Sequence, residues 1–353
     1  MHRTRSLACL VAAALALSAS VVPAAPAQPA RPGGGQTGFV PDPVDMAAAK
    51  REGTVTWYTS TPIETAQKIA KMFEEQTGIK VQLFRSGGTA TLRRFLQEVD
   101  AGRILADVLT ISDPAAYSML AKRDLLVPFK PKNFDKVPDS LKDPQGRFIA
   151  QRLNMLGMVA RTDKGIELPK NWTDLTDPKY KGKMVMPDPS FTANMLMVVS
   201  VLSQKYGWRY YQQLRANDVM IVQGHQQVSD TLTSGERWIA AEGEGSYTWK
   251  DQQAGHKVVF IIPTDGAVAV PAPTAVIKGS PHPNAAKALA EFMISDAVQK
   301  FFPGEGNYAA RVDIEPPAGQ PPLSQIKLLP VDYEYVEREA TNIKNRFAEI
   351  FQR

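Results

Sequence analysis

After the first fifty residues, the spacing of apolar side chains alternates between two periods. Residues 54–60, TVTWYTS, are β-rich, residues 62–78 carry apolar side chains every three or four positions, and residues 79–86, IKVQLFRS, are β-rich again. A period of two indicates a strand, whereas a period near 3.6 indicates a helix. This stretch therefore predicts a strand, a helix and a strand, with Ser60 or Thr61 capping the helix at its start.

The same alternation continues further along. Two glycines and Thr89 open a helical pattern over residues 87–103, and residues 106–112, ADVLTIS, form a β-rich run. Another helical pattern begins with Asp113 as its cap. Because the connections between these strands and helices are short, the chain predicts the α/β class with a mostly parallel sheet. In such a sheet the carboxyl ends of the strands and the N-termini of the helices meet at one edge, where ligands bind.

Residues 155–265 repeat this scheme with different turns. A strand at MVM precedes a long apolar helix whose start carries Ser190, Thr192 and Asn194. A later strand runs into EGEG, residues 242–245, which is not expected to open a helix. This part of the chain is therefore predicted to be a second α/β unit.

The last third of the chain predicts a return to the first unit. Residues 267–302 read as two strands and a helix, and their prolines indicate a domain boundary. We expect two lobes that are joined by more than one crossing and separated by a cleft. Lobe 1 comprises residues 44–154 and 270–320, and lobe 2 comprises residues 155–269. Residues 321–353 are expected to form a C-terminal helical segment that packs on the lobes.

Hydroxyl-bearing residues and glycines gather at the predicted strand ends and helix starts. The free N–H groups and the dipole at a helix N-terminus favour a bound anion. One such terminus is a common cap, but several on one edge of a sheet predict an anion site. The candidate ligand-binding residues of this kind are Thr59, Ser60, Thr61, Ser86, Gly87, Thr89, Ser112, Asp113, Ser190 and Thr192.

Residues 1–27 predict a cleaved export signal. Arg3 and Arg5 precede an apolar run over residues 7–22, and small residues in an Ala-x-Ala pattern end the segment. The run is shorter than the ~20 residues that a membrane-spanning helix needs. We therefore expect a periplasmic protein in which residues 28–43, rich in proline and glycine, are a flexible lead-in.

Composition narrows the chemistry further. The single cysteine, Cys9, lies at the start of the apolar run, so we expect no lipid attachment there and no cysteine in the mature chain. Disulfides and thiolate sites are thereby excluded. The formal net charge of +5 falls to +3 when Arg3 and Arg5 are removed. This modest excess suits a small anion and is not the pattern of a nucleic-acid-binding protein.

The sequence contains no recognisable catalytic motif. It lacks a Gly-x-Ser-x-Gly turn, a Walker loop and a Gly-x-Gly-x-x-Gly turn after the first strand. His225, His256 and His282 lie in contexts typical of solvated or capping histidines. Tyr210 and Tyr211 follow one another in a helical pattern and are expected to be packing residues. We therefore expect no enzyme activity and no cofactor.

The stretch EGEGSY, residues 242–247, allows several interpretations. Glu242, Glu244 and Tyr247 are hard oxygen donors that suit a metal ion. Alternatively, Glu242 points outward and the glycines only bend the chain. A carboxylate here would also suit an amine on a ligand.

Residues 53–81, 106–129, 187–208 and 265–302 form four segments in a distinctive order. Together they resemble the extracellular solute-binding proteins of ABC importers, over about residues 50–320. The nearest branch includes ferric-iron binders and binders of phosphonates, sugar phosphates and other organic anions. The resemblance implies a two-lobed periplasmic binding protein of type II, closure about a hinge, and permease membrane subunits as partners.

The resemblance also allows the residues of this chain to be compared with those that bind ferric ion in such proteins. Ferric binders of this type usually carry a donor after the first strand, an acid after the ADV strand, and two consecutive tyrosines in the strand that here ends in GEGSYTW. In this chain Pro62 or its hydroxyl-bearing neighbours occupy the first position, and the second falls near Ser112, with Asp113 one residue further on. In the third, Ser246 precedes Tyr247. A trivalent ion needs several anionic oxygens, and most of the expected ones are absent from this chain. Iron held by Tyr247 and Glu244 is therefore the alternative to an organic anion.

The anion-binding part of the family pattern is retained. Ser190 and Thr192 match the helix N-terminus that holds an anion in such proteins. Arg152, near the expected crossing, either adds a bidentate charge or is a surface arginine. Tyr247 or Trp249 is expected to pack against the carbon skeleton of the ligand. We expect a monomer that passes a small organic anion to a permease. A sensor or relay protein would use the same two-lobed body with a different partner.

Overall fold

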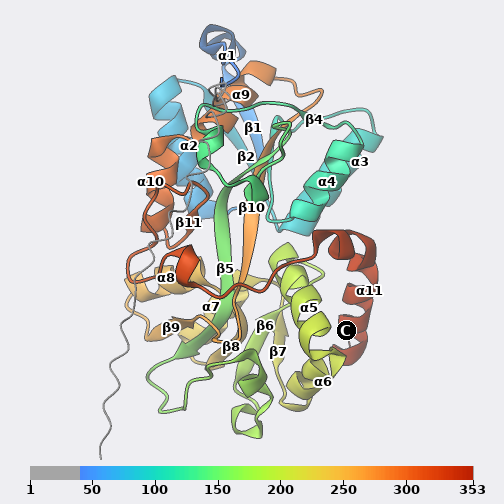
Figure 1. Ribbon diagram of the computed structural model, residues 1–353, viewed down its shortest axis with the longest axis vertical. Helices are drawn as coiled ribbons and strands as arrows, with labels where there is room; N and C mark the ends of the chain where they lie inside the picture. The colour runs from blue at the N-terminus through green and yellow to red at the C-terminus, as the bar shows by residue number, and fades with distance from the viewer. Residues whose placement is uncertain (1–39, 353) are drawn as a thin grey trace, which may run out of the picture. The chain divides into compact units, whose positions relative to one another are not determined.

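The computed structural model describes residues 40–352, and its strands form one mixed sheet (Figure 1). The order along the sheet is β2-β1-β3-β10-β5-β8-β6-β7, with β4 paired to β10, and β9 and β11 paired to β5. The strands are β1 (Thr54–Thr59), β2 (Lys80–Arg85), β3 (Val108–Thr110), β4 (Leu126–Val127), β5 (Ile149–Arg161), β6 (Met184–Pro187), β7 (Met220–Val222), β8 (Ile239–Glu244), β9 (Val258–Ile261), β10 (Val268–Ile277) and β11 (Tyr308–Ala309). Strands β1, β2 and β3 are mutually parallel, as are β6, β7 and β8, so the predicted α/β class is confirmed.

Strands β5 and β10 connect the two parallel halves of the sheet. They run side by side and antiparallel through both halves, which we call lobe 1 (around β1, β2 and β3) and lobe 2 (around β6, β7 and β8) (Figure 1). Asn154 is paired with Val270, and Met155 with Ala269. Both lobes belong to one compact unit, Phe39–Arg353. The chain therefore passes between the lobes on these two adjacent strands, and it passes again between β11 and the C-terminal helix, residues 333–351, whose apolar face joins the core of lobe 2.

Strand β10 corrects one prediction. The sequence predicts two strands followed by one helix, but the structure has one continuous strand followed by two helices. Pro271 and Pro273 lie inside this strand, and the register shifts between Ala272 and Pro273. A bulge of this kind tolerates a proline, which cannot donate a hydrogen bond to a regular ladder.

Helices cover the sheet of lobe 1. They are α1 (Met46–Glu52), α2 (Ile63–Thr77), α3 (Gly88–Asp100), α4 (Pro114–Lys122), α9 (Pro283–Met293) and α10 (Asp296–Gly304). Asp113 caps α4, as predicted. The predicted cap of α2 is wrong, because Pro62 occupies the N-cap position. The Thr61 hydroxyl instead accepts hydrogen bonds from Thr59 Oγ1 and Arg152 Nη1.

Lobe 2 has its own apolar core. Its helices are α5 (Ala193–Tyr206), α6 (Trp208–Ala216), α7 (His225–Ser234) and α8 (Gly245–Gln253). Tyr210 and Tyr211 on α6 are buried in this core, which confirms that they are packing residues. The prediction that EGEG opens no helix is wrong, because β8 ends at Glu244 and α8 begins at Gly245. The polar sequence of α8 lacks the apolar period that marks a packed helix.

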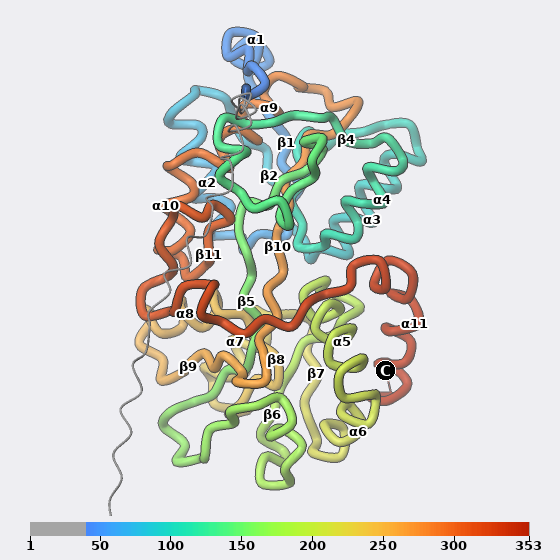
Figure 2. Tube along the Cα trace, in the orientation of Figure 1, coloured from blue at the N-terminus to red at the C-terminus, as the bar shows by residue number. Residues whose placement is uncertain are grey.

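The C-terminal helix α11 (Tyr333–Phe351) contacts both lobes. It packs on α4 of lobe 1 and on α5 and α6 of lobe 2 (Figure 2). Its apolar face, which includes Phe347 and Phe351, joins the core of lobe 2. Lys122 Nζ on α4 lies 3.3 Å from Glu337 Oε2 on α11. Short 3-10 turns occur at Phe134–Lys136, Asp139–Leu141, Trp172–Thr176, Pro178–Tyr180 and Leu323–Gln325.

The predicted signal segment, residues 1–27, and most of the predicted lead-in lie outside the described residues. At the start of the described chain, the Asp42 carboxylate accepts a hydrogen bond from the backbone N–H of Lys130. Between residues 40 and 352, no helix is both long enough and apolar enough to cross a membrane.

Candidate ligand-binding site

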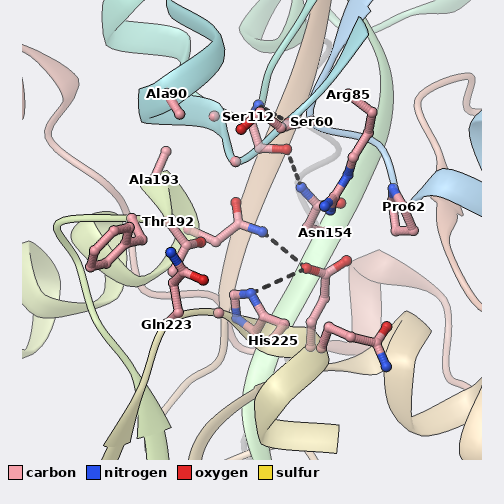
Figure 3. Close-up of a pocket in the computed structure, with 18 of the residues that line it drawn as sticks. Ser60, Pro62, Arg85, Ala90, Ser112, Asn154, Thr192, Ala193, Gln223 and His225 are labelled. Carbon is pink, nitrogen blue, oxygen red and sulfur yellow. Dashed lines mark hydrogen bonds and ion pairs between the residues drawn. The ribbon is translucent and has the colours of Figure 1, made fainter. Parts of the chain in front are cut away.

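A cavity of about 540 Å³ lies between the lobes, at the ends of strands and the starts of helices. Figure 3 shows Ser60 and Ser112 of lobe 1 on one side of it and Gln223 and His225 of lobe 2 on the other. Its size is typical of a site for a small molecule. Of the predicted ligand-binding residues, those that line the cavity are Ser60, Ser86, Gly87, Ser112, Arg152, Thr192 and Tyr247.

Five other predicted residues are not in the cavity lining. Thr59 and Thr61 are fully buried and bond to each other behind the wall. Asp113 accepts a hydrogen bond from the Ala116 N–H as the cap of α4. The N–H of Ser190 donates to Asp188 within a turn. Thr89 lies in the first turn of α3 and is also outside the lining.

Five helices begin at the cavity without a side-chain cap. Residues at the starts of α2, α3, α5, α7 and α8 line it, and none of these helices has a side-chain hydrogen bond at its N-cap. The first N–H groups of these helices therefore keep partial positive charge, except at α8, where the carboxylate of Glu244 stands at the cap position. Converging helix N-termini favour an anion between them.

Arg152 on β5 is buried, which excludes the surface interpretation. Its side chain lines the cavity, the residue is 2% exposed, and Nη1 donates to Thr61 Oγ1 at 3.1 Å. Nε has no hydrogen-bond partner among residues 40–352. Burial lowers the pKa of Arg152 to about 10, although the charge of Glu244 and the Tyr247 hydroxyl act in the opposite direction. A buried, incompletely paired guanidinium is suited to bind an anion.

Ser60 and Ser112 add hydroxyl donors at the edge of lobe 1. Ser60 Oγ accepts from the Ser112 N–H at 3.3 Å, and Ser112 Oγ accepts from Asn154 Nδ2 at 2.6 Å. Each hydroxyl keeps its own hydrogen, for which the described part of the chain offers no acceptor. Both are therefore able to donate to a ligand in the cavity.

Glu244 and Tyr247 form the opposite wall, at the start of α8. Glu244 Oε2 accepts from Asn194 Nδ2 at 3.0 Å, and Oε1 accepts from the Ser246 hydroxyl at 2.7 Å. Burial, helped by the charge of Glu244, raises the pKa of Tyr247 to about 12, so the tyrosine is neutral. Both carboxylate oxygens of Glu244 are thus already engaged by lobe 2.

His225 corrects a further prediction. It is not solvated, since it is buried, lines the cavity and places Nε2 3.0 Å from both oxygens of Glu242. Glu242 does not point outward, because it is also buried. Burial disfavours the charged imidazole, but the carboxylates of Glu242 and Glu244 outweigh this effect and raise the pKa of His225. The interpretation of Glu242 as an outward residue is therefore wrong.

Several lining residues were missed by the sequence analysis: Arg85, Arg93, Asn154, Phe191, Asn194, Gln223, His225, Gln226 and Gln227. Some of them could have been predicted from their position. The sequence GHQQ, residues 224–227, follows a strand and opens a helix, as the predicted ligand-binding residues do. Asn154 was identifiable as a polar residue beside the expected crossing. In the described chain, no group of three or more His, Cys, Asp and Glu residues is arranged for a metal ion.

Comparison with known proteins is consistent with this geometry. A putative 2-aminoethylphosphonate-binding periplasmic protein of Salmonella typhimurium is 25% identical over 239 residues, which are 64% of this chain and 68% of the relative. The periplasmic binding protein AfuA from Actinobacillus pleuropneumoniae, with fructose-6-phosphate bound, has a TM-score of 0.76 at 22% identity, covering 85% of this chain and 99% of AfuA. Iron-bound HitA from Pseudomonas aeruginosa has a TM-score of 0.72 at 20% identity, covering 83% and 99%.

The family match extends over most of the chain. The model of the family described as bacterial extracellular solute-binding protein matches residues 103–339, which include all of lobe 2 and part of lobe 1. The solved structures share the two-lobed fold. The chain belongs to the family of bacterial extracellular solute-binding proteins, as the order of its four segments predicted.

Proposed function

We propose that this protein captures a small organic anion between its lobes and delivers it to the membrane subunits of an ABC importer. The observation that carries the proposal is Arg152, a buried cation with an unpartnered Nε in the wall of the cavity. The uncapped N-termini of α2, α3, α5 and α7 support the same charge preference. The phosphonate-binding relative and the sugar-phosphate-bound structure are in accord with an anionic ligand.

Capture takes place by closure of lobe 2 (residues 155–269) on lobe 1 (residues 44–154 and 270–320). The hinge is the middle of β5 and β10, where Asn154 pairs with Val270. A small change in backbone angles at two adjacent strands rotates one lobe relative to the other. The protein acts as a monomer, because both walls of the cavity come from one chain.

Ferric ion fits the charge of the site less well than an organic anion does. Tyr247 and Glu244 are the available oxygen donors, but the Glu244 oxygens already accept hydrogen bonds from Asn194 and Ser246. The buried guanidinium of Arg152 lines the same cavity and would repel a trivalent cation.

The binding experiment uses protein that has been purified without refolding. Thermal unfolding and calorimetric titration are measured with fructose 6-phosphate, 2-aminoethylphosphonate, succinate and ferric citrate. At a hundredfold excess over Kd, a bound anion should stabilise the protein by about 2.7 kcal/mol. The ligand should be recovered chemically unchanged.

The variant Arg152→Met tests the role of Arg152 in anion binding. Arg103→Met, on the exposed surface, is the matched control. We expect the first variant to lose anion binding and the second to retain it. The proposal is contradicted if only ferric ion stabilises the protein, or if Arg152→Met binds anions as tightly as the parent protein.

We also infer export to the periplasm with removal of residues 1–27. N-terminal sequencing of the secreted protein should begin at Gln28. Reconstitution with the permease encoded beside its gene separates delivery to an importer from signalling, since only an importer accumulates ligand inside vesicles.

A further inference from the structure

We propose that the ligand carries hydrogen-bond donors in addition to its anionic group, and that Asn154 and Asn194 select for these donors. This inference rests on the proposed function, because it concerns the same cavity and a ligand that Arg152 holds. The substrate class is therefore an organic anion that bears hydroxyl or ammonium groups, rather than a simple anion.

Asn194 in lobe 2 lines the cavity and has a carbonyl oxygen that is unpaired within the described chain. The residue lies in the first turn of α5, is 7% exposed and lines the cavity. Its Nδ2 donates to Glu244 Oε2 at 3.0 Å. Because a carboxylate oxygen accepts, this bond determines which end of the amide faces Glu244. The remaining atom, Oδ1, is buried and finds no partner in the described part of the chain.

Asn154 on β5 also has a side-chain carbonyl oxygen that no described residue pairs. It is 1% exposed, and its Nδ2 donates to Ser112 Oγ at 2.6 Å (Figure 3). Its Oδ1 is likewise buried without a partner among residues 40–352. Each asparagine therefore has a buried acceptor that is unpaired in this part of the chain and has already used a donor within the protein. A buried acceptor that stays unpaired costs free energy, which a ligand donor recovers.

The spacing along β5 relates these acceptors to the anion. Arg152 and Asn154 are two residues apart on one strand, so both project from the same face, about 7 Å apart along the chain. Phosphate, phosphonate and carboxylate groups in their ionised forms contribute only acceptors. A ligand that satisfies Arg152 and both asparagines thus has its anionic group separated from its donors by a short carbon skeleton.

The experiment compares matched pairs of anions on the full chain. 2-Aminoethylphosphonate is paired with propylphosphonate, which has a methyl group in place of the amine. Glycerol 3-phosphate is paired with propyl phosphate, which lacks both hydroxyls. We expect the donor-bearing member of at least one pair to bind tenfold to hundredfold more tightly. The first pair reports on ammonium and the second on hydroxyl groups.

Asn154→Leu and Asn194→Leu identify the residues responsible. The readout is the ratio of the two affinities within a pair, because either substitution also removes a hydrogen bond to Glu244 or Ser112 and can change the affinity for both members alike. In each variant the preference for the donor-bearing partner should fall about tenfold. Retained binding of the donor-free anion also shows that the variant is folded, and a merely structural role would not produce this split.

The possible failures are distinguishable. If all four anions bind in an Arg152-dependent way and the members of each pair bind equally, the inference is overturned and the proposed function stands. The inference is also overturned if the preference survives both substitutions. If none of the anions binds, the proposed function and the inference fail together.

Discussion

Gly87 of lobe 1 approaches the backbone carbonyl oxygen of Phe191 in lobe 2 so closely that a Cβ at position 87 would lie 2.7 Å from that oxygen. The φ angle of Gly87 is −61°, which any residue adopts, so close approach rather than backbone conformation requires the glycine. Both residues line the cavity. The two lobes therefore meet at this point, and the contact leaves no room for a methyl group.

Gly87→Ala should hold the lobes apart and weaken ligand binding. An overpacked contact of this kind costs about 1–3 kcal/mol, which corresponds to a Kd roughly 5-fold to 150-fold higher. Calorimetric titration measures the Kd, and small-angle scattering reports whether the ligand still closes the lobes. Gly224→Ala is the matched control, because its Cβ would make only an ordinary 3.5 Å contact with Gln227. Equal affinities in the two variants would show that the Phe191 contact does not limit closure.

Arg152→Met should stabilise the ligand-free protein while abolishing anion binding. Burial lowers the pKa of Arg152 to about 10, so the folded state disfavours its charge. Replacing an imperfectly paired buried charge with an apolar side chain often raises the free energy of unfolding, by about 1–4 kcal/mol. Urea unfolding without ligand measures this change. The exposed cavity residue Arg85, changed to Met, should alter the free energy by no more than about 0.5 kcal/mol. A less stable Arg152→Met protein would mean that the arginine supports the fold.

The pair of His225 and Glu242 should make stability depend on pH. Because the folded protein raises the pKa of His225, its charged form contributes stability that is complete below about pH 6.5 and is lost as the pH rises through the raised value. The free energy of unfolding should therefore fall as the pH rises above about 6.5. His225→Asn combined with Glu242→Gln should remove this part of the fall, whereas His256→Asn, on the exposed surface, should leave it intact. An unchanged fall in the double variant would assign it to other groups.

Phe347→Ala should destabilise lobe 2 through the C-terminal helix. The Phe347 ring is buried, with its centroid 5.8 Å from that of Tyr211 and 4.5 Å from that of Phe351. Removing a buried phenylalanine costs about 3–5 kcal/mol. Asn345→Ala, on the exposed side of the same helix, should stay within about 0.5 kcal/mol. Denaturant unfolding distinguishes the two, and similar values would mean that α11 is only loosely attached.

Elements with a strong period or a clear cap could be predicted from the sequence. The apolar positions of α2 and the Asp113 cap of α4 are local signals, and the structure has both elements where these signals lie. Helix α8 has a polar sequence without such a period and was therefore missed. In β10, Pro271 and Pro273 signal a break, but a bulge accommodates them within one strand. Here tertiary pairing overrides a local rule.

Most of the site residues that could be predicted from the sequence are those at the ends of strands and the starts of helices. Ser60, Ser112 and Thr192 follow from that rule. The burial of Arg152 does not, because it depends on packing between strands that are more than one hundred residues apart in sequence. The contact of His225 with Glu242 joins α7 to β8 and has no local signal either. Such contacts between distant segments can be identified only from the three-dimensional structure.

The position of α11 has a consequence for how the chain folds. Val336, Ile343, Phe347 and Phe351 of this helix complete the apolar core of lobe 2, whose first strand begins at Met184. Lobe 1 likewise needs α9 and α10, which follow all of lobe 2 in the sequence. Each core therefore depends on helices that follow the strands of the other lobe in the sequence, α11 for lobe 2 and α9 and α10 for lobe 1. Neither lobe can complete its packing from one continuous stretch of the chain, so the folding of the two lobes is interdependent.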